Sequence, residues 1–374
     1  MAERAPLKAA PDAVLVGAVA TLVALGLVMV FSASSAYAVA LHHDAGYFLK
    51  RQLAWLAVAL AAAAVAYRVD YHRLRAFAPL LLALCVLSLT LVLVPHVGIY
   101  VGGARRWLGA GPFSFEPSEF TKLALVLYLA SALAAKGEKI RSFSHGLFPL
   151  AFVAILLGVL VVLEPDLGTA SLLAFTTATM LFVAGARPAH MLVVGAMLAA
   201  GGTLLVRHDP YKLARITAFV DPWKDPLDKG FHIVQSLMAL GSGGLAGLGL
   251  GFSRQKYFWL PEAPTDFIAA IIGEELGFIG LFVVIVLFVV FAYRASRIAL
   301  AAPDRFGFLL AVGCMATIVI QAFVNLGVVT SSWPVTGVPL PFISFGGSSL
   351  VSSLIAVAIV VNVGRQRRLE DRVE

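Results

Sequence analysis

Charge and cysteine are both scarce in this chain of 374 residues. Only 13% of the residues are charged, about half the fraction of a soluble domain, whereas 60% are hydrophobic and the mean hydropathy is +0.92. The two cysteines, Cys85 and Cys314, stand singly inside apolar runs, which excludes a disulfide framework and predicts two small buried side chains. The composition therefore excludes a soluble globular enzyme and indicates a polytopic membrane protein.

Familiar cofactor and nucleophile motifs are missing as well. No GxGxxG, HExxH, CxxC or GxSxG element occurs in a plausible setting, so nothing indicates ATP hydrolysis. There is no low-complexity linker, and no internal repeat supports the inverted halves of many transporters. The net charge of +7 lacks a basic patch with interleaved aromatic residues, which argues against a nucleic-acid partner. We expect a single integral membrane domain over residues 1–374.

Long apolar runs dominate what is present. A bilayer span needs roughly 20 apolar residues, and we predict an all-α polytopic fold with about ten transmembrane helices. The predicted spans are 13–33, 52–67, 76–95, 119–135, 147–163, 168–185, 189–206, 267–293, 307–329 and 346–364. The fifth and sixth are separated only by residues 164–166.

Lysine and arginine fix the predicted orientation. Most of them fall in loops on one side of the spans, whereas the short loops of the other side hold only Lys50, Arg51, Arg105 and Arg106. The positive-inside rule then places both termini in the cytoplasm, with tails 1–12 and 365–374, and a large extracytoplasmic loop, 207–266, between helices 7 and 8. Residues 33–38 resemble a signal-peptidase site, but the preceding run is span-length, so we interpret it as an uncleaved first helix.

Three carboxylates lie at or inside the eighth apolar run. Asp266 is the first residue of this run, on the external side. Its carboxylate is either a helix N-cap, a role that Thr265 could also perform, or a partly desolvated base with a raised pKa. Glu274 and Glu275 follow roughly 12 Å deeper. Acids in hydrocarbon are costly and mark functional sites by default; a proton relay and internal salt bridges both remain open for this pair.

External cations accompany these acids. Arg254 and Lys256 precede Asp266 by about ten residues. They are either solvated side chains of a charged loop or ligands of a phosphate or pyrophosphate. Arg215, Lys212 and His232 could join them. Glu119 and Lys122 are spaced i, i+3 on a helix face and can form a structural ion pair.

Other external segments are more structured than loops require. Glu116, Arg105 and Arg106 extend the Glu119–Lys122 pair into a mixed-charge cluster on the outer face. Residues 231–250 are apolar but glycine-rich, which favours a partly inserted or re-entrant segment. Residues 331–349 contain prolines that prevent a helix, and they either line a cavity or form a tight turn.

Several of these stretches together resemble one family. The matching motifs are FVDPWKDPLDKGFHIVQSLMALGSGG at 219–244, LPEAPTDFIAAIIGEELGFIG at 260–280, FEPSEFTK at 115–122, EPDLG at 164–168 and PFISFGGSS at 341–349. In this order, and over about residues 15–365, they resemble the SEDS glycosyltransferases of shape, elongation, division and sporulation. The chain looks more similar to the division branch, FtsW, than to the elongation branch, RodA. It departs from the family at Pro264, where a histidine is usual.

The resemblance implies a peptidoglycan glycosyltransferase of the bacterial plasma (inner) membrane, with its active site outside. The substrates would be lipid II, the undecaprenyl-pyrophosphate disaccharide-peptide, and the nascent glycan strand. Asp266 matches the family's essential acid and would be the general base of an inverting displacement. Asp166 and Ser344 lie in matching motifs, and we add them to the substrate-binding candidates, which are Arg254, Lys256, Arg215, Glu119, Lys122, Arg105, Asp166, Glu274 and Ser344.

Cofactor and partners follow from the same resemblance. A divalent cation, Mg²⁺ or Mn²⁺, could share the stabilisation of the pyrophosphate, but the sequence does not place its ligands. The expected partners are a class B penicillin-binding protein and other division proteins. Two other classes stay open: a lipid II flippase that uses the intramembrane acids as a proton relay, and a non-catalytic division scaffold.

Overall fold

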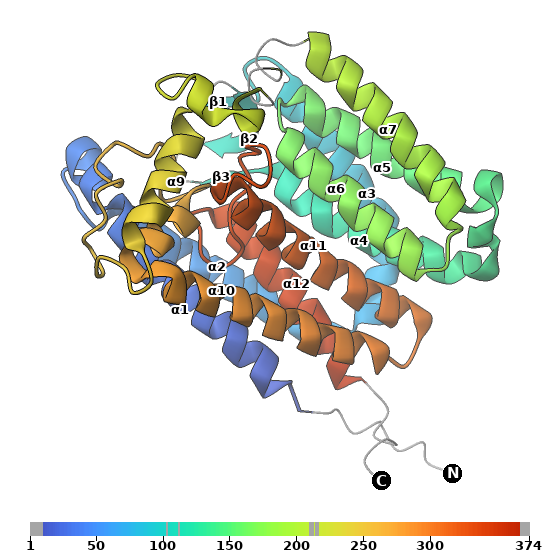
Figure 1. The fold of residues 1–374 in the computed structure, drawn as a ribbon. Coiled ribbons are helices and arrows are strands. Elements are labelled where there is room, and N and C mark those ends of the chain that lie inside the picture. Colours follow the sequence, from blue (N-terminus) through green and yellow to red (C-terminus); the bar gives the residue numbers. More distant parts are fainter. Residues whose placement is uncertain (1–9, 102–103, 111–112, 209–212, 214–216, 367–374) are drawn as a thin grey trace.

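The fold is an all-α polytopic membrane fold, seen in a computed structural model (Figure 1). The structure describes residues 10–101, 104–110, 113–208, 213 and 217–366. Its longer helices are α1 (Ala13–His42), α2 (Tyr47–Arg68), α3 (Tyr71–Leu93), α4 (Pro117–Lys136), α5 (Phe148–Leu163), α6 (Leu167–Val183), α7 (Pro188–His208), α9 (Phe231–Gly243), α10 (Ile268–Leu300), α11 (Arg305–Val329) and α12 (Gly347–Arg365).

Each predicted span falls on one of these helices. Within the described residues, eight helices are long and apolar enough to cross a membrane, and α6 and α7 are shorter apolar helices. The largest differences from the predicted bounds are at two helix ends: α1 continues nine residues past residue 33, to His42, and α10 continues past residue 293 to Leu300. Asp12 explains where α1 begins, because its carboxylate caps the Leu15 N–H at 3.0 Å and also binds the Arg294 guanidinium of α10.

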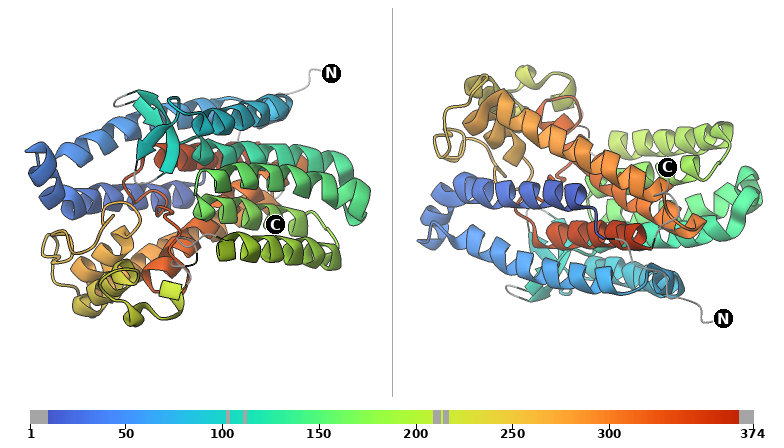
Figure 2. Two further views of the ribbon diagram at one scale, coloured as in Figure 1. Left: turned by 90° about the horizontal axis from the view of Figure 1, so that it is seen from above. Right: turned by 90° about the horizontal axis from the view of Figure 1, so that it is seen from below.

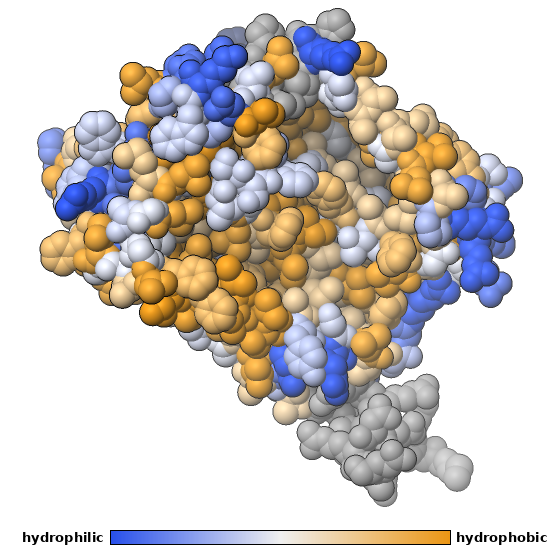
Figure 3. Space-filling model, in the orientation of Figure 1, coloured by the Kyte–Doolittle hydropathy of each residue, from blue (hydrophilic) through white to orange (hydrophobic). Residues whose placement is uncertain are grey.

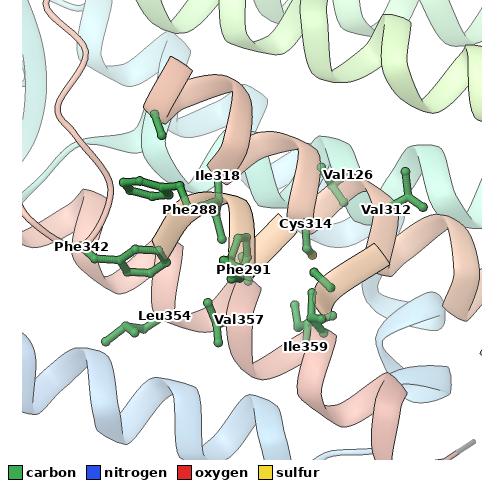
Figure 4. Close-up of a cluster of buried hydrophobic side chains, with 14 of the residues drawn as sticks. Val126, Phe288, Phe291, Val312, Cys314, Ile318, Phe342, Leu354, Val357 and Ile359 are labelled. Carbon is green, nitrogen blue, oxygen red and sulfur yellow. The ribbon is translucent and has the colours of Figure 1, made fainter. Parts of the chain in front are cut away.

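The helices form one bundle around α11 and α12. α12 packs against α2 and α11, α10 against α1, α9 and α11, and α4 against α3, α6 and α11 (Figure 2). The start of α1 and the end of α12, which are the two termini of the described chain, lie at the same end of the bundle (Figure 1). The apolar centre includes Phe288 and Phe291 of α10 and Phe342 (Figure 4). Cys314 lies in this core, and Cys85 is also buried and free, as the sequence predicted.

A small sheet is the exception to the helical fold. Strands β1 (Ile99–Val101), β2 (Ala104–Ala110) and β3 (Phe113–Phe115) are antiparallel in the order β1-β2-β3. The sheet occupies the segment between α3 and α4 and lies at the end of the bundle opposite the chain termini (Figure 1). The sequence indicated an ordered segment here but not strands.

Helix α10 is interrupted at Gly277, whose φ of 69° and ψ of −168° are not helical. The glycine-rich turn after α9 supplies the missing backbone partners. The carbonyl oxygens of Glu274 and Glu275 accept from Leu248 N at 2.9 Å and Gly249 N at 3.0 Å. On the other side of the break, Phe278 N donates to the Gly244 carbonyl at 2.9 Å. Irregular backbone in an apolar environment requires such partners, so the glycine-rich segment and the break form one unit.

We expect Gly247→Ala to destabilise this unit by about 2–4 kcal/mol. Gly247 has φ +80°, and an added Cβ would stand 2.2 Å from the Glu275 carbonyl oxygen. Both the left-handed backbone and the clash with main chain oppose the side chain. Thermal unfolding in detergent measures the effect, with Gly195→Ala of α7 as the control because nothing lies within 4 Å of its added Cβ. Equal melting temperatures for the two variants would contradict this account.

Candidate functional site

Asp266 lies in the turn that leads into α10, at the end of the bundle opposite the chain termini. The N-cap of α10 is Phe267, so the N-cap reading of Asp266 is not what the structure adopts. The side chain is half-buried, and Oδ2 lies 3.5 Å from the position that a Cβ on Gly337 would occupy. Gly337 has φ +73°, so a glycine there allows both the turn and the close approach to the carboxylate.

The 331–349 segment holds this turn in place. Ser344 Oγ donates to the Thr265 carbonyl at 2.6 Å and accepts from Leu340 N at 2.8 Å. Phe345 N donates to the Pro264 carbonyl at 2.8 Å. Ser344 is 5% exposed, so its hydroxyl is occupied inside the protein. This differs from the expected substrate contact: Ser344 positions the main chain of Asp266. The segment is non-helical, as its prolines predicted.

A buried polar network connects the Asp266 turn to α4 through two amides of α11. Asn325 Nδ2 donates to the Asp266 carbonyl at 2.7 Å and to the Val338 carbonyl at 2.8 Å. One helical turn away, Gln321 Nε2 donates to the Pro339 carbonyl at 2.9 Å, and its Oε1 accepts from Lys122 Nζ at 2.6 Å. Spacing i, i+4 places both amides on one face of α11.

Lys122 and Glu119 close this network as a buried ion pair. Their charged groups lie 2.8 Å apart with 3% and 4% side-chain exposure, and Ser352 Oγ of α12 donates to Glu119 at 3.0 Å. The sequence predicted the pair but missed Gln321 and Asn325. The sequence signal that could have indicated them is the presence of two amide side chains, one helical turn apart, inside the apolar run 307–329.

Glu274 and Glu275 bind the loop that precedes Asp266. Glu275 accepts from Ser32 Oγ at 2.7 Å and forms an ion pair with Lys256 at 3.3 Å. Glu274 accepts from Arg254 N at 3.0 Å and from Gln255 N at 3.4 Å. Of the two alternatives for these acids, the structure shows internal bonding that fixes residues 251–257 to the break in α10.

The two loop cations therefore differ. Lys256 was expected to contact phosphate, but its side chain is 4% exposed and its Nζ also donates to the Gly251 carbonyl at 2.6 Å. In this arrangement it stabilises the loop. The Arg254 side chain is exposed and forms no ion pair with any carboxylate of the described residues. Arg215 and Lys212 lie outside the described residues.

A second group of acids surrounds the start of α6. Asp166 is 2% exposed and caps α6 by accepting from Thr169 N at 2.9 Å. Arg106 of β2 donates to the main-chain carbonyls of Glu164 and Pro165, and its strand neighbour Arg105 is half-buried. Both carboxylate oxygens of the buried Glu164 lack a hydrogen-bond partner in the described part of the chain. The predicted mixed-charge cluster is thus divided between the buried Glu119–Lys122 pair and this outer group.

Burial raises the pKa of Glu164 to about 9, and the neighbouring Asp166 and Glu116 act in the same direction. Burial and the carboxylates of Asp166 and Glu119 also raise the pKa of Glu116. These acids hold protons at neutral pH in the folded protein, whereas the unfolded chain releases them near pH 4.5. Their stabilising contribution is complete below that pH and is lost as the pH rises toward 9.

We therefore expect Glu164→Gln to flatten the pH dependence of stability. Wild type should lose thermal stability between about pH 5 and 9, by roughly 1.4 kcal/mol for each unit of pKa difference at most. Glutamine cannot ionise, so the variant should lose less stability than wild type through that range, and the remaining loss should come from Glu116. Melting temperatures across the pH series test this, with Glu138→Gln, an exposed acid at the opposite end of the bundle, as the control. Parallel curves for wild type and Glu164→Gln would contradict the assignment.

A divalent cation has no ready-made site in the part of the chain that the structure describes. No group of three or more His, Cys, Asp or Glu side chains there is placed to hold a metal ion. Glu116, Glu164 and Asp166 are close enough to affect one another's charge, but they do not form such a group. The described side chains thus do not form a three-ligand metal site.

Comparison with known proteins identifies the family. The model of the FtsW/RodA/SpoVE family, described as "Cell cycle protein", matches residues 12–369. The chain belongs to this family. Stage V sporulation protein E of Bacillus subtilis is 46% identical over 96% of this chain and 99% of its own length. A probable peptidoglycan glycosyltransferase FtsW of Trichlorobacter lovleyi is also 46% identical, over 96% of this chain and 94% of its own length.

Solved structures of the FtsW/RodA/SpoVE family agree with the fold. RodA of Thermus thermophilus has a TM-score of 0.70 and 32% identity, covering 96% of this chain and 98% of that chain. A chain from a structure of a peptidoglycan synthase complex that coordinates polymerization and crosslinking has a TM-score of 0.79 and 33% identity, covering 97% and 99%. The chain is therefore a multi-pass membrane protein of this family, with the fold that its sequence predicted.

Proposed function

We propose that this chain is a peptidoglycan glycosyltransferase that polymerises lipid II into β-1,4 glycan strands. Membership of a family in which relatives at 46% and 44% identity are named probable peptidoglycan glycosyltransferases supports the reaction class. The observation that supports Asp266 as the catalytic residue is the way its turn is held. Its main chain is bonded at three successive residues, 264–266, to the 331–349 segment and α11, so the carboxylate is presented from a rigid support, as catalysis by a positioned base requires.

The proposed reaction is a single inverting displacement. Asp266 takes the proton from the 4-hydroxyl of the acceptor sugar, and that oxygen attacks the anomeric carbon of the donor. The anomeric C–O bond breaks, and undecaprenyl pyrophosphate leaves with the electron pair. An α-linked donor thereby gives a β-linked product. Arg254 is the exposed loop cation that could stabilise the negative charge on the leaving pyrophosphate.

The orientation of the site follows from charge. Arg294 pairs with Asp12 at the start of α1, Arg297 lies in the last turn of α10 and Arg305 begins α11. These cations share the bundle end at which α1 begins, so we place that end in the cytoplasm. Asp266 and residues 217–266 then face outward, where the glycan strand is built. A class B penicillin-binding protein is the proposed partner, because a chain of a peptidoglycan synthase complex is similar over nearly the whole sequence. Equal identity to a sporulation protein and to FtsW leaves the branch to experiment.

Labelled lipid II supplied to the purified chain, with and without its partner, tests this proposal. We expect glycan ladders on a gel in at least one of the two conditions. Transport of lipid II across proteoliposome membranes without any ladder would instead establish a flippase. Neither ladder nor transport, with partner binding intact, would establish a scaffold.

A further inference from the structure

A cavity of about 590 Å³, widely open to the outside, lies at the bundle end that holds the chain termini, away from Asp266. It lies between the connection from α4 to α5 and the connection from α6 to α7. Its lining combines two arginines with a histidine, two serines and a phenylalanine; the residues are Arg141, Ser142, Phe143, Ser144, Arg187 and His190. Figure 3 shows hydrophilic surface at the outer corner of the bundle where the α4–α5 connection lies. Nothing in the glycosyltransferase mechanism uses these side chains.

The two arginines of this cavity have no ion-pair partner among the residues that the structure describes. Arg141 and Arg187 are both exposed, and neither forms an ion pair with a carboxylate of residues 10–101, 104–110, 113–208, 213 or 217–366. The other cations of this end are often engaged; Arg294, for example, pairs with Asp12. Two guanidiniums and two serine hydroxyls around one cavity suit the oxygen atoms of a phosphate group.

An aromatic stripe runs from this cavity along α5. The Phe143 and Phe148 ring centroids are 6.0 Å apart, and those of Phe148 and Phe152 are 6.2 Å apart. The three side chains are 36%, 46% and 54% exposed, so the stripe faces out of the bundle. At the end of the stripe next to the cavity, the His190 and Phe143 rings pack edge to face, with their centroids 5.4 Å apart. The stripe therefore joins the basic cavity to the apolar flank of a predicted span.

A local irregularity of the backbone produces this alignment. Residues Phe143–Leu147 form a π-helical turn, in which hydrogen bonds close from i to i+5 rather than i+4. Phe148 N accordingly bonds to the Phe143 carbonyl. The wider turn places Phe143 next to Phe148, and the following i+4 step places Phe152 on the same face. Such turns recur at functional sites.

We propose that this cavity binds the headgroup of an anionic phospholipid from the adjacent membrane leaflet. The phosphate diester lies between Arg141 and Arg187, and an acyl chain lies along Phe148 and Phe152. A soluble phosphate compound would use the two arginines but would leave the aromatic stripe unused. Basic pockets between helices at the membrane boundary bind acidic headgroups in this manner. The inference concerns binding alone and does not depend on the proposed reaction.

Native mass spectrometry of the full-length chain in detergent tests the proposal, with phosphatidylglycerol, phosphatidylcholine and inorganic phosphate as probes. We expect phosphatidylglycerol to bind in preference to phosphatidylcholine. The double variant Arg141→Gln/Arg187→Gln should weaken phosphatidylglycerol binding by about 30-fold, since each cation near the surface contributes about fivefold. Arg141→Lys/Arg187→Lys should retain much of the binding, because it keeps both positive charges.

Two further variants separate the alternatives. Arg73→Gln/Arg297→Gln removes two exposed cations from the same end of the bundle and should change binding less than about twofold. Phe148→Ala/Phe152→Ala should weaken phosphatidylglycerol binding through the lost acyl contacts. Unchanged lipid binding in Arg141→Gln/Arg187→Gln would overturn the proposal. So would displacement of phosphatidylglycerol by an equal concentration of inorganic phosphate, since the site would then recognise phosphate alone.

Discussion

Asp266→Asn should reduce glycan polymerisation by at least about 100-fold while the protein remains folded. A positioned general base contributes on the order of 10²–10⁴ to a rate, and asparagine cannot accept the proton of the acceptor hydroxyl. The fold should survive because main-chain contacts of this turn remain: Asn325 and Ser344 bond to the carbonyls of Asp266 and Thr265. Ladder formation from labelled lipid II and the melting temperature should be measured on the same preparation.

Asp228→Asn provides the matched control for that prediction. Asp228 is an exposed acid of the same external segment, and its replacement makes the same change in charge. It should retain ladders and melting temperature. If Asp266→Asn also kept full polymerisation, Asp266 would not be the base. Glu274 and Glu275 are engaged in fixing the 251–257 loop, so another carboxylate would then have to supply the base.

Lys122→Ala should destabilise the folded protein by about 3–5 kcal/mol. The substitution leaves the Glu119 carboxylate buried without its cation, and an uncompensated buried charge is costly. It also removes the donor to Gln321 Oε1, which weakens the network that reaches the Asp266 carbonyl. Thermal unfolding measures the loss. Lys50→Ala is the control, since it breaks the exposed pair with Asp44, whose side chains are 71% and 40% exposed, and should cost less than about 1 kcal/mol.

The double variant Glu119→Gln/Lys122→Met distinguishes stability from catalysis. Removing both charges together should recover most of the stability that Lys122→Ala loses, because buried pairs are often replaceable by uncharged side chains of similar volume. If the recovered protein also makes ladders, the pair is structural. If it is stable but makes no ladders, the pair contributes to the reaction. A double variant as unstable as Lys122→Ala would contradict the ion-pair explanation.

Sequence patterns selected several residues of the candidate site because some physical requirements are local. Asp266 was found from its place at the start of an apolar run, and Glu119 with Lys122 from their i, i+3 spacing. Local reasoning gave Lys256 an outward role, because a loop cation usually faces solvent, and the matching family motif gave Ser344 a substrate contact. Their actual partners, Glu275 for Lys256 and the Thr265 carbonyl for Ser344, are distant in the chain, and no local pattern indicates them.

The sequence by itself determined that this is a polytopic helical membrane protein of one family, where its spans fall and which acid opens the eighth. Those properties depend on the cost of burying charge and backbone in lipid, which acts on each segment separately. Only the tertiary structure decided that α10 is broken at Gly277, that the glycine-rich turn completes its hydrogen bonds, and that Gln321 and Asn325 join Lys122 to the Asp266 turn. These outcomes required polar groups from separate helices to find one another inside the bundle, where an unpaired group is expensive.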